Sequence, residues 1–99
     1  MIKVTQTWTR PDVNTPFFKV KDSVKEYISR KYTQTNKVII QRTDDATGSL
    51  TVSIVTIYAN EAARTEYNED PEIVKVKQAR WAYHTTNRIT TVDPDVEEI

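Results

Sequence analysis

The chain has 99 residues, with 14 basic and 14 acidic side chains and no cysteine. This length predicts one domain with a modest core, which we place at residues 1–93, followed by an acidic tail at residues 94–99. The lack of cysteine excludes disulfides, thiolate catalysis and cysteine-ligated metal sites. The formal net charge of zero gives no bulk attraction to nucleic acid or to an anionic membrane, so neither is an expected partner.

The sequence also limits the expected cellular location and the kinds of cofactor site that the protein can have. The first residues alternate polar and apolar side chains and lack the apolar core of a signal peptide. No apolar run approaches the length that a transmembrane helix needs, so we expect a soluble, cytoplasmic protein. The only glycine, Gly48, excludes glycine-rich phosphate loops, and the only histidine, His84, excludes a multi-histidine metal site within one chain. We expect neither a metal nor another cofactor.

The first predicted element is a strand over Ile2–Arg10. Its polar and apolar residues alternate, so Val4, Trp8 and the polar Gln6 fall on one face. The proline that follows ends the strand, because proline has no backbone N–H to pair with a neighbour.

A helix is predicted next, because apolar residues recur there at helical spacing. These residues are Val20, Val24, Tyr27, Ile28 and Tyr32. Two starts remain open for this helix. Thr15, which precedes a proline, fits a helix cap, whereas Ser23 with Glu26 three residues later fits a capping box.

Two more strands are predicted at Lys37–Thr43 and Ser49–Ala59, joined by a hairpin loop at Asp44–Gly48 whose glycine can take a positive φ. The second of these strands is the longest β-branched apolar run. One of its faces carries Leu50, Val52, Ile54, Thr56 and Tyr58. The other face turns apolar at Val55 and Ile57. A strand covered on both faces reads as a continuous apolar run, so a second subunit is a candidate to cover these two residues. The alternative is that they are ordinary surface residues.

The second helical region begins after Asn60, a good helix N-cap. Its pattern breaks at Asp70-Pro71, because the residue before a proline avoids the helical conformation. We expect either two short helices or one kinked helix. The last predicted strand covers Arg88–Asp93. The tail at Pro94–Ile99 is expected to be poorly ordered unless its apolar residues dock.

The predicted order of elements is β-α-β-β-α-β, which is the order of the ferredoxin-like α+β fold. We therefore expect a four-stranded antiparallel sheet with two helices on one face and the first and third strands in its centre. The other face of this sheet stays open and carries Val55 and Ile57.

On this topology and these two residues, the chain resembles the dimeric α+β-barrel group over Ile2–Asp93. The group consists of ferredoxin-like proteins and includes antibiotic-biosynthesis-type monooxygenases. The resemblance implies that two open sheet faces pair, so we expect a homodimer through the face of Val55 and Ile57. No catalytic motif of the group is matched, so the resemblance assigns no functional residue. The stretch at residues 67–91 is also similar to short uncharacterised proteins of phages and marine sequences.

The most distinctive polar set lies on the second helical region, after its proline. Lys77, Arg80 and His84 fall at i, i+3 and i+7 in the middle of an apolar arc. Nitrogen-bearing side chains that face a cavity can hold an anion or an enolate-like substrate. The candidate ligand-binding residues are therefore Lys77, Arg80, Trp81 and Tyr83. The alternative is that the long basic side chains lie along apolar surface with their charged ends in water.

His84 is the candidate catalytic residue, because its ordinary pKa suits a general base near neutral pH. The alternative is a structural histidine near a helix end. Two functions remain open. The sequence favours a self-associating binding or structural module without catalysis. The second is a cofactor-independent dimeric α+β-barrel enzyme, monooxygenase-like or isomerase-like, acting on a small aromatic or anionic substrate. That second function requires a closed apolar pocket of about 300 Å³ or more beside His84.

Overall fold

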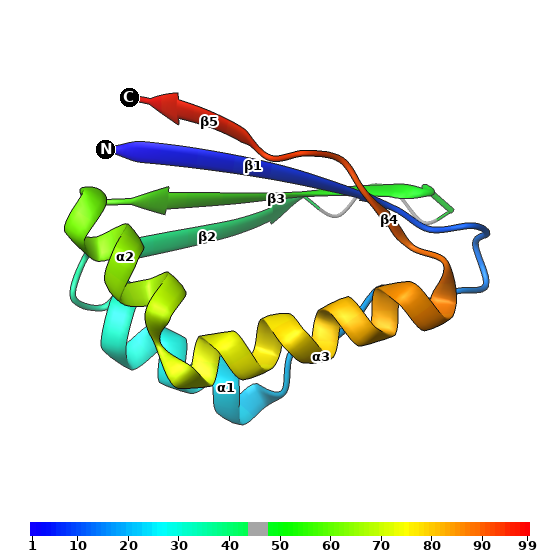
Figure 1. Cartoon of the computed structure of the whole chain (residues 1–99), viewed down its shortest axis with the longest axis horizontal. Coiled ribbons are helices and arrows are strands. Elements are labelled where there is room, and N and C mark those ends of the chain that lie inside the picture. The colour runs from blue at the N-terminus through cyan, green and yellow to red at the C-terminus, as the bar shows by residue number, and fades with distance from the viewer. Residues whose placement is uncertain (44–47) are drawn as a thin grey trace.

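The computed structural model describes residues 1–43 and 48–99 and shows an antiparallel sheet with its helices on one face (Figure 1). The elements follow in the order β1 (Ile2–Thr9), α1 (Asp22–Ile28), the π-helix η1 (Ser29–Thr33), β2 (Val38–Thr43), β3 (Thr51–Tyr58), α2 (Glu61–Glu69), α3 (Pro71–Asn87), β4 (Thr90–Thr91) and β5 (Asp95–Glu98). Of the predicted hairpin loop, Gly48 has the expected positive φ of 100°. Residues 44–47 lie outside the described residues.

The sheet has the strand order β2-β3-β1-β4, and β5 also pairs with β1. In the centre, Ile2 lies opposite Tyr58 and Trp8 lies opposite Val52. The predicted antiparallel sheet, with the first and third strands in its middle, is confirmed. The apolar character of β3 explains its place there, because a central strand is covered more fully than an edge strand.

The predicted number of four strands is wrong, because β5 makes a fifth in the described part of the chain. Val96 of β5 lies opposite Val4 of β1. The two chain ends also meet: the Met1 ammonium donates to the Ile99 carbonyl at 2.9 Å, and the Ile99 amide donates to the Met1 carbonyl at 2.7 Å. The strand predicted at 88–93 shrinks to two residues, because Arg88 ends α3 with a positive φ of 57°.

Neither predicted start of the first helix is used. Thr15 belongs to a loop in which Asp12 Oδ1 accepts hydrogen bonds from the Thr15 amide and hydroxyl, each at 2.9 Å. The N-cap of α1 is Lys21, which provides no side-chain hydrogen bond, and Ser23 lies inside the helix. The helix then widens into η1, a π-helix that the spacing of apolar residues did not predict.

The expected break in the second helical region occurs at Asp70. This residue is extended, with φ −63° and ψ 123°, and it separates α2 from α3. Asn60 caps α2 as predicted, because its side chain accepts from the Ala63 amide at 2.9 Å. Of the two alternatives, the structure has two helices, although α3 with 17 residues is not short.

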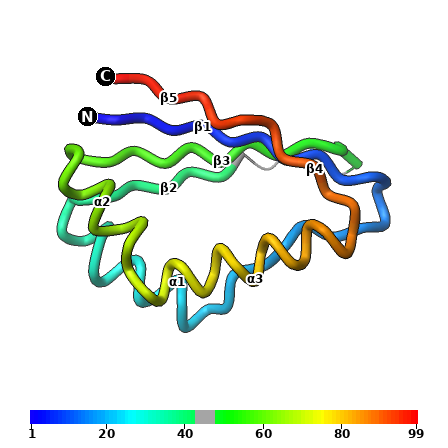
Figure 2. Tube along the Cα trace, viewed as in Figure 1, coloured from blue at the N-terminus to red at the C-terminus, as the bar shows by residue number. Residues whose placement is uncertain are grey.

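Two groups of buried side chains join the layers at opposite ends of the sheet. At the end of α2 and η1 the core consists of Ile2, Tyr32, Val38, Tyr58, Tyr67 and Ile73. At the other end it consists of Trp8, Val52 and Ile89. Figure 2 shows α3 running across the helix side of the sheet between these two ends. The middle of the sheet's helix-facing side is therefore bounded by two packed ends.

The opposite sheet face carries no helix in the described part of the chain (Figure 1). Val55 and Ile57 are half-buried on this face. Ile39 of β2 pairs with Ile57 and is 42% exposed. The described residues contain no helix long and apolar enough to span a membrane.

Candidate functional site

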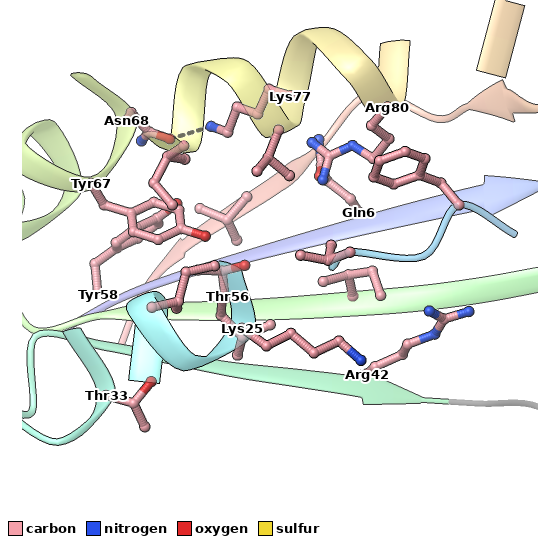
Figure 3. A pocket seen from close by; sticks show the side chains of 18 of the residues that line it. Gln6, Lys25, Thr33, Arg42, Thr56, Tyr58, Tyr67, Asn68, Lys77 and Arg80 are labelled. Carbon is pink, nitrogen blue, oxygen red and sulfur yellow. Dashed lines mark hydrogen bonds between the residues drawn. The ribbon is translucent and has the colours of Figure 1, made fainter. Parts of the chain in front are cut away.

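A cavity of about 920 Å³ lies between the sheet and the helices (Figure 3). Its apolar lining comes from both layers and includes Val4, Ile28, Ile54, Ile73 and Val76. Small-molecule sites in proteins typically have volumes of ~300–1,000 Å³ and mostly apolar walls with a few polar groups. The cavity therefore has room for a small organic molecule.

The sheet side of the cavity is formed by alternate residues of two central strands, because successive side chains on a strand point to opposite faces. These residues are Val4, Gln6 and Trp8 of β1 and Ile54, Thr56 and Tyr58 of β3. Gln6 and Thr56 are polar at positions that face the helices. Together with the Trp8 indole and the Tyr58 hydroxyl, they are the hydrogen-bonding groups on this side of the cavity.

Basic side chains predominate among the charged residues that line the cavity. They are Lys19, Lys25, Arg42, Arg64, Lys77 and Arg80, whereas Asp22 is the one acidic residue among the described lining residues. The whole chain has a formal net charge of zero, so this excess of positive charge is local. A concave site lined by one sign of charge raises the local concentration of ligands of the opposite sign.

Lys77 and Arg80 line the cavity from α3, and the Lys77 side chain is directed toward Asn68 (Figure 3). The Lys77 ammonium donates to Asn68 Oδ1 and lies 5.9 Å from the centre of the Tyr67 ring. The Arg80 guanidinium lies 4.8 Å from the centre of the Trp8 ring. Within residues 1–43 and 48–99, neither cation forms an ion pair with a carboxylate. Both charges are instead held by neutral groups.

The surroundings of these cations also act on their protonation. Burial lowers the pKa of Lys77, and the nearby charges of Arg80 and Arg64 lower it further. Burial likewise lowers the pKa of Arg80. Burial raises the pKa of Tyr67 to about 12, so its hydroxyl stays neutral at physiological pH. The cavity thus combines crowded cations with a neutral phenol, and an anionic ligand would relieve the crowding.

The other two predicted ligand-binding residues lie elsewhere. Trp81 is 72% exposed on α3 and does not line the cavity. The Tyr83 hydroxyl donates to the Pro16 carbonyl at 2.6 Å, and its ring lies 5.6 Å from that of Phe18. Tyr83 therefore ties α3 to the loop before α1. Lys77 and Arg80 are the predicted residues that the structure brings together at the cavity.

His84 is buried one turn beyond Arg80. Its ring packs edge-on against Trp8, with ring centres 5.1 Å apart, and its Nε2 has no hydrogen-bond partner among the described residues. Burial lowers the pKa of His84, and the charge of Arg80 lowers it further, so the imidazole is neutral near neutral pH. The enzymatic interpretation required a closed apolar pocket beside His84. The cavity is large enough, but Trp8 and Arg80 line it and His84 does not.

The sequence did not identify the sheet side of the site or its α1 side. Gln6 and Thr56 could have been predicted as site residues, because each is a polar residue at a strand position whose side chain points toward the helices by period-two alternation. Lys25 and Ile28 of α1 could not have been predicted, because their position at the cavity depends on how α1 packs against the rest of the protein. Within the described residues, no three histidine or acidic side chains are grouped closely enough to hold a metal ion.

The chain matches no protein-family model and no curated protein. Several solved structures are similar to it, among them the following two. A "putative antibiotic biosynthesis monooxygenase" from Deinococcus radiodurans matches with a TM-score of 0.61 and 11% identity, over 100% of this chain and 92% of the other. HapK from Hahella chejuensis matches with a TM-score of 0.59 and 12% identity, over the same shares of the two chains. The chain has the ferredoxin-like α+β fold. At such low identities, the ferredoxin-like fold is what these similarities show.

Proposed function

We propose that this protein binds a small anionic molecule with an apolar body in the cavity between its sheet and its helices. The observation that carries the proposal is the presence of Lys77 and Arg80 in an apolar cavity without a carboxylate partner among the described residues. Both side chains are half-buried, and a charge that is partly removed from water without a counter-ion is less favourable than a fully solvated one. Such an arrangement is typical of sites where a ligand supplies the missing charge.

The apolar part of the ligand would lie against the sheet. Ile54 and Val4 line the cavity there, while Gln6 and Thr56 offer hydrogen bonds that can orient the ligand. The basic Lys25 of α1 also lines the cavity, so an anion would meet positive charge on both helical sides. This distribution favours a ligand with one charged end and one apolar end.

Catalysis is a second candidate function, and the cavity is the observation that favours it. An anionic, enolate-like intermediate would be stabilised by Arg80 and Lys77 in the same position as a bound anion. His84 could act as a base only if a ligand reached past Trp8, whose ring packs against it. We therefore favour binding without catalysis. Recovery of a bound ligand chemically unchanged would support binding, and its conversion would support the enzyme.

We also propose that two copies of the chain associate through the open sheet face. Val55 and Ile57 supply its half-buried apolar centre, and Ile39 adds an exposed neighbour. Lys3 of β1 lies opposite Glu97 of β5 in the sheet register on the same face. A two-fold interface brings the same patch of each copy together, and a patch with apolar groups and both signs of charge can complement itself.

The binding proposal is tested with two naphthalene probes of similar size, one anionic and one neutral. We expect 1-naphthoate to bind at least about tenfold more tightly than 1-naphthalenemethanol, because a carboxylate can pair with Lys77 and Arg80, whose present partners are neutral. Titrations followed by amide NMR should shift the resonances of Gln6, Lys77 and Arg80.

The matched variants are Lys77→Met and Lys75→Met on the same helix. Lys75 pairs with Glu72 at 3.4 Å and does not line the cavity. Lys77→Met should weaken 1-naphthoate binding by about tenfold, and Lys75→Met should leave it unchanged. Equal affinity for the neutral and the anionic probe would overturn the proposal.

A further inference from the structure

We propose that the ligand carries two negative charges at the end that meets α3, and that Lys77 and Arg80 bind this doubly charged group together. This inference rests on the proposed function, because it concerns the same cavity. It goes further by naming the class of ligand. The class is an amphipathic dianion, such as a phosphate monoester or a dicarboxylate with an apolar body.

The first step is the placement of the two cations. Lys77 and Arg80 are three residues apart on α3, and residues at this spacing lie on the same side of a helix. Both line the cavity, and Figure 3 shows the Lys77 side chain directed along α3 toward Asn68 and the Arg80 side chain on the same helix. The charge of Arg80 acts on Lys77, so the two cations are close enough to influence each other. Arg64 of α2 lines the same cavity. The anionic end of a ligand would therefore meet Lys77 and Arg80 at once, with Arg64 as a further source of positive charge.

The second step is the balance of charge. The partner of the Lys77 ammonium is the Asn68 amide oxygen, and the Arg80 guanidinium lies on the Trp8 ring. Neither partner carries a negative charge. A ligand with one negative charge would leave one of the two half-buried cations uncompensated, which is unfavourable. A ligand with two negative charges compensates both.

The third cation nearby does not alter this balance. Arg64 has its own acidic neighbour, because its guanidinium lies 3.9 Å from a Glu61 carboxylate oxygen on the same helix. Asp22, the acidic residue among the described lining residues, belongs to α1. Lys19, Lys25 and Arg42 also line the cavity, but they lie outside α3. At the end of the ligand that meets α3, the two charges to be matched are therefore those of Lys77 and Arg80.

The third step is the shape of the charged groups. A guanidinium presents a planar set of donors that bind two oxygens side by side, whereas an ammonium acts as a compact point charge. A phosphate monoester has three terminal oxygens and can satisfy both groups at once. Two neighbouring carboxylates can do the same. The side-chain amides of Gln6 and Asn68 line the cavity as well and can bind the remaining oxygens.

The test compares 1-naphthyl phosphate with 1-naphthalenesulfonate, which share the ring and a tetrahedral head. Above about pH 7 the phosphate carries two charges, because its second pKa is about 6, whereas the sulfonate carries one. We expect the phosphate to bind at least about tenfold more tightly at about pH 7.5. Below about pH 5 this preference should disappear as the phosphate gains a proton. The sulfonate reports any change in the protein itself, because its own charge is constant.

Variants assign the preference to the two cations. Lys77→Met and Arg80→Met should each remove the preference for the phosphate, and Lys75→Met should preserve it. Lys77→Gln provides a second, polar replacement in case the apolar one disturbs the fold, and circular dichroism confirms folding of each variant.

A parallel comparison of phthalate with benzoate distinguishes a dicarboxylate from a phosphate monoester as the doubly charged group. Phthalate should exceed benzoate by about tenfold if the head group is a dicarboxylate.

Each outcome decides the question. A preference for either dianion that is lost in Lys77→Met supports the inference and names the source of the charge. Equal binding of dianions and monoanions, still weakened in Lys77→Met, overturns the inference and leaves the proposed function standing. If none of the four anions binds, or if their affinities are unchanged in Lys77→Met and Arg80→Met, both proposals are overturned.

Discussion

Tyr32 donates a hydrogen bond of 2.5 Å from its buried hydroxyl to Asp70 Oδ2. The same oxygen accepts from the Tyr27 hydroxyl at 2.7 Å and from the Lys31 ammonium at 3.0 Å. The other carboxylate oxygen accepts from the Glu72 amide at 2.9 Å. One carboxylate therefore caps α3 and fixes η1 against the junction of α2 and α3. Because these helices form one side of the cavity, it also fixes the shape of the site.

Asp70→Asn should destabilise the protein by about 3 kcal/mol, because a neutral amide cannot accept three donors at one position as a carboxylate does. The amide oxygen can still cap α3, so the loss reflects the contacts with η1. Urea unfolding followed by circular dichroism measures the change. Asp22→Asn is the matched control, since Asp22 is exposed in the first turn of α1, and its effect should stay within about 0.5 kcal/mol. Equal effects of the two variants would contradict this prediction.

The same carboxylate should make the protein acid-sensitive. Burial raises the pKa of Asp70, but the hydrogen bonds from Tyr32, Tyr27 and Lys31 outweigh it and hold the pKa well below its usual range. In the unfolded chain the pKa is about 3.9, so the unfolded state takes up the proton first as the pH falls. The stabilisation is complete above about pH 5 and is lost progressively below about pH 4. Urea unfolding at a series of pH values from about 5 downward measures the free energy of unfolding. This free energy should fall more steeply for the natural chain than for Asp70→Asn. If the free energy of unfolding fell equally steeply for both proteins, Asp70 would not be the source of the acid sensitivity.

His84 provides a separate pH prediction at higher pH. Its pKa is lowered in the folded state, so below about pH 6.5 the unfolded chain binds a proton that the folded chain does not. Stability should therefore fall as the pH decreases from about 6.5. As the only histidine in the chain, it gives a single imidazole Hε1 signal, and proton NMR should place its midpoint below about 6.5. His84→Gln should remove the decline in this range. A midpoint at or above the ordinary value would contradict the buried, unpaired environment.

The sheet could be predicted from sequence, whereas β5 and η1 could not. β1 shows alternating polar and apolar residues, β2 and β3 show runs of β-branched residues, and the predicted strand at Ser49–Ala59 differs from β3 by at most two residues at each end. β5 contains one apolar residue, Val96, among acidic ones, a composition typical of a solvated tail. Pairing with β1 makes it a strand. Likewise, η1 is held by Asp70, which lies 38 residues beyond Tyr32 in the chain.

The part of the candidate site that lies on a single helix could be predicted from residue spacing. Lys77 and Arg80 share a face of α3 by their spacing, and both line the cavity. Trp81 follows Arg80 directly, so a rotation of about 100° per residue turns it out of the cavity, and it is exposed. Tyr83 contacts the loop before α1, a long-range partner that no local spacing predicts.

The ligand-free protein should tolerate the loss of Lys77. Lys77→Met removes a half-buried charge crowded by Arg64 and Arg80, and it costs one hydrogen bond to Asn68. Since binding sites commonly sacrifice stability for function, the free energy of unfolding should be unchanged or higher by up to about 1 kcal/mol. Thermal unfolding of the variant and of Lys75→Met measures this. A loss larger than about 1 kcal/mol would show that Lys77 stabilises the fold.

The open sheet face should govern self-association. Ile57→Lys places an ammonium in the apolar centre of this face, beside Lys3, with which residue 57 is in register. A buried like-charge pair is unfavourable in a two-fold contact, so we expect a dimer for the natural chain and a monomer for the variant by sedimentation at micromolar concentration. Trp81→Lys is the control, because Trp81 is 72% exposed on α3, away from this face. A monomeric natural chain, or a dimer lost only in Trp81→Lys, would exclude the sheet face as the interface.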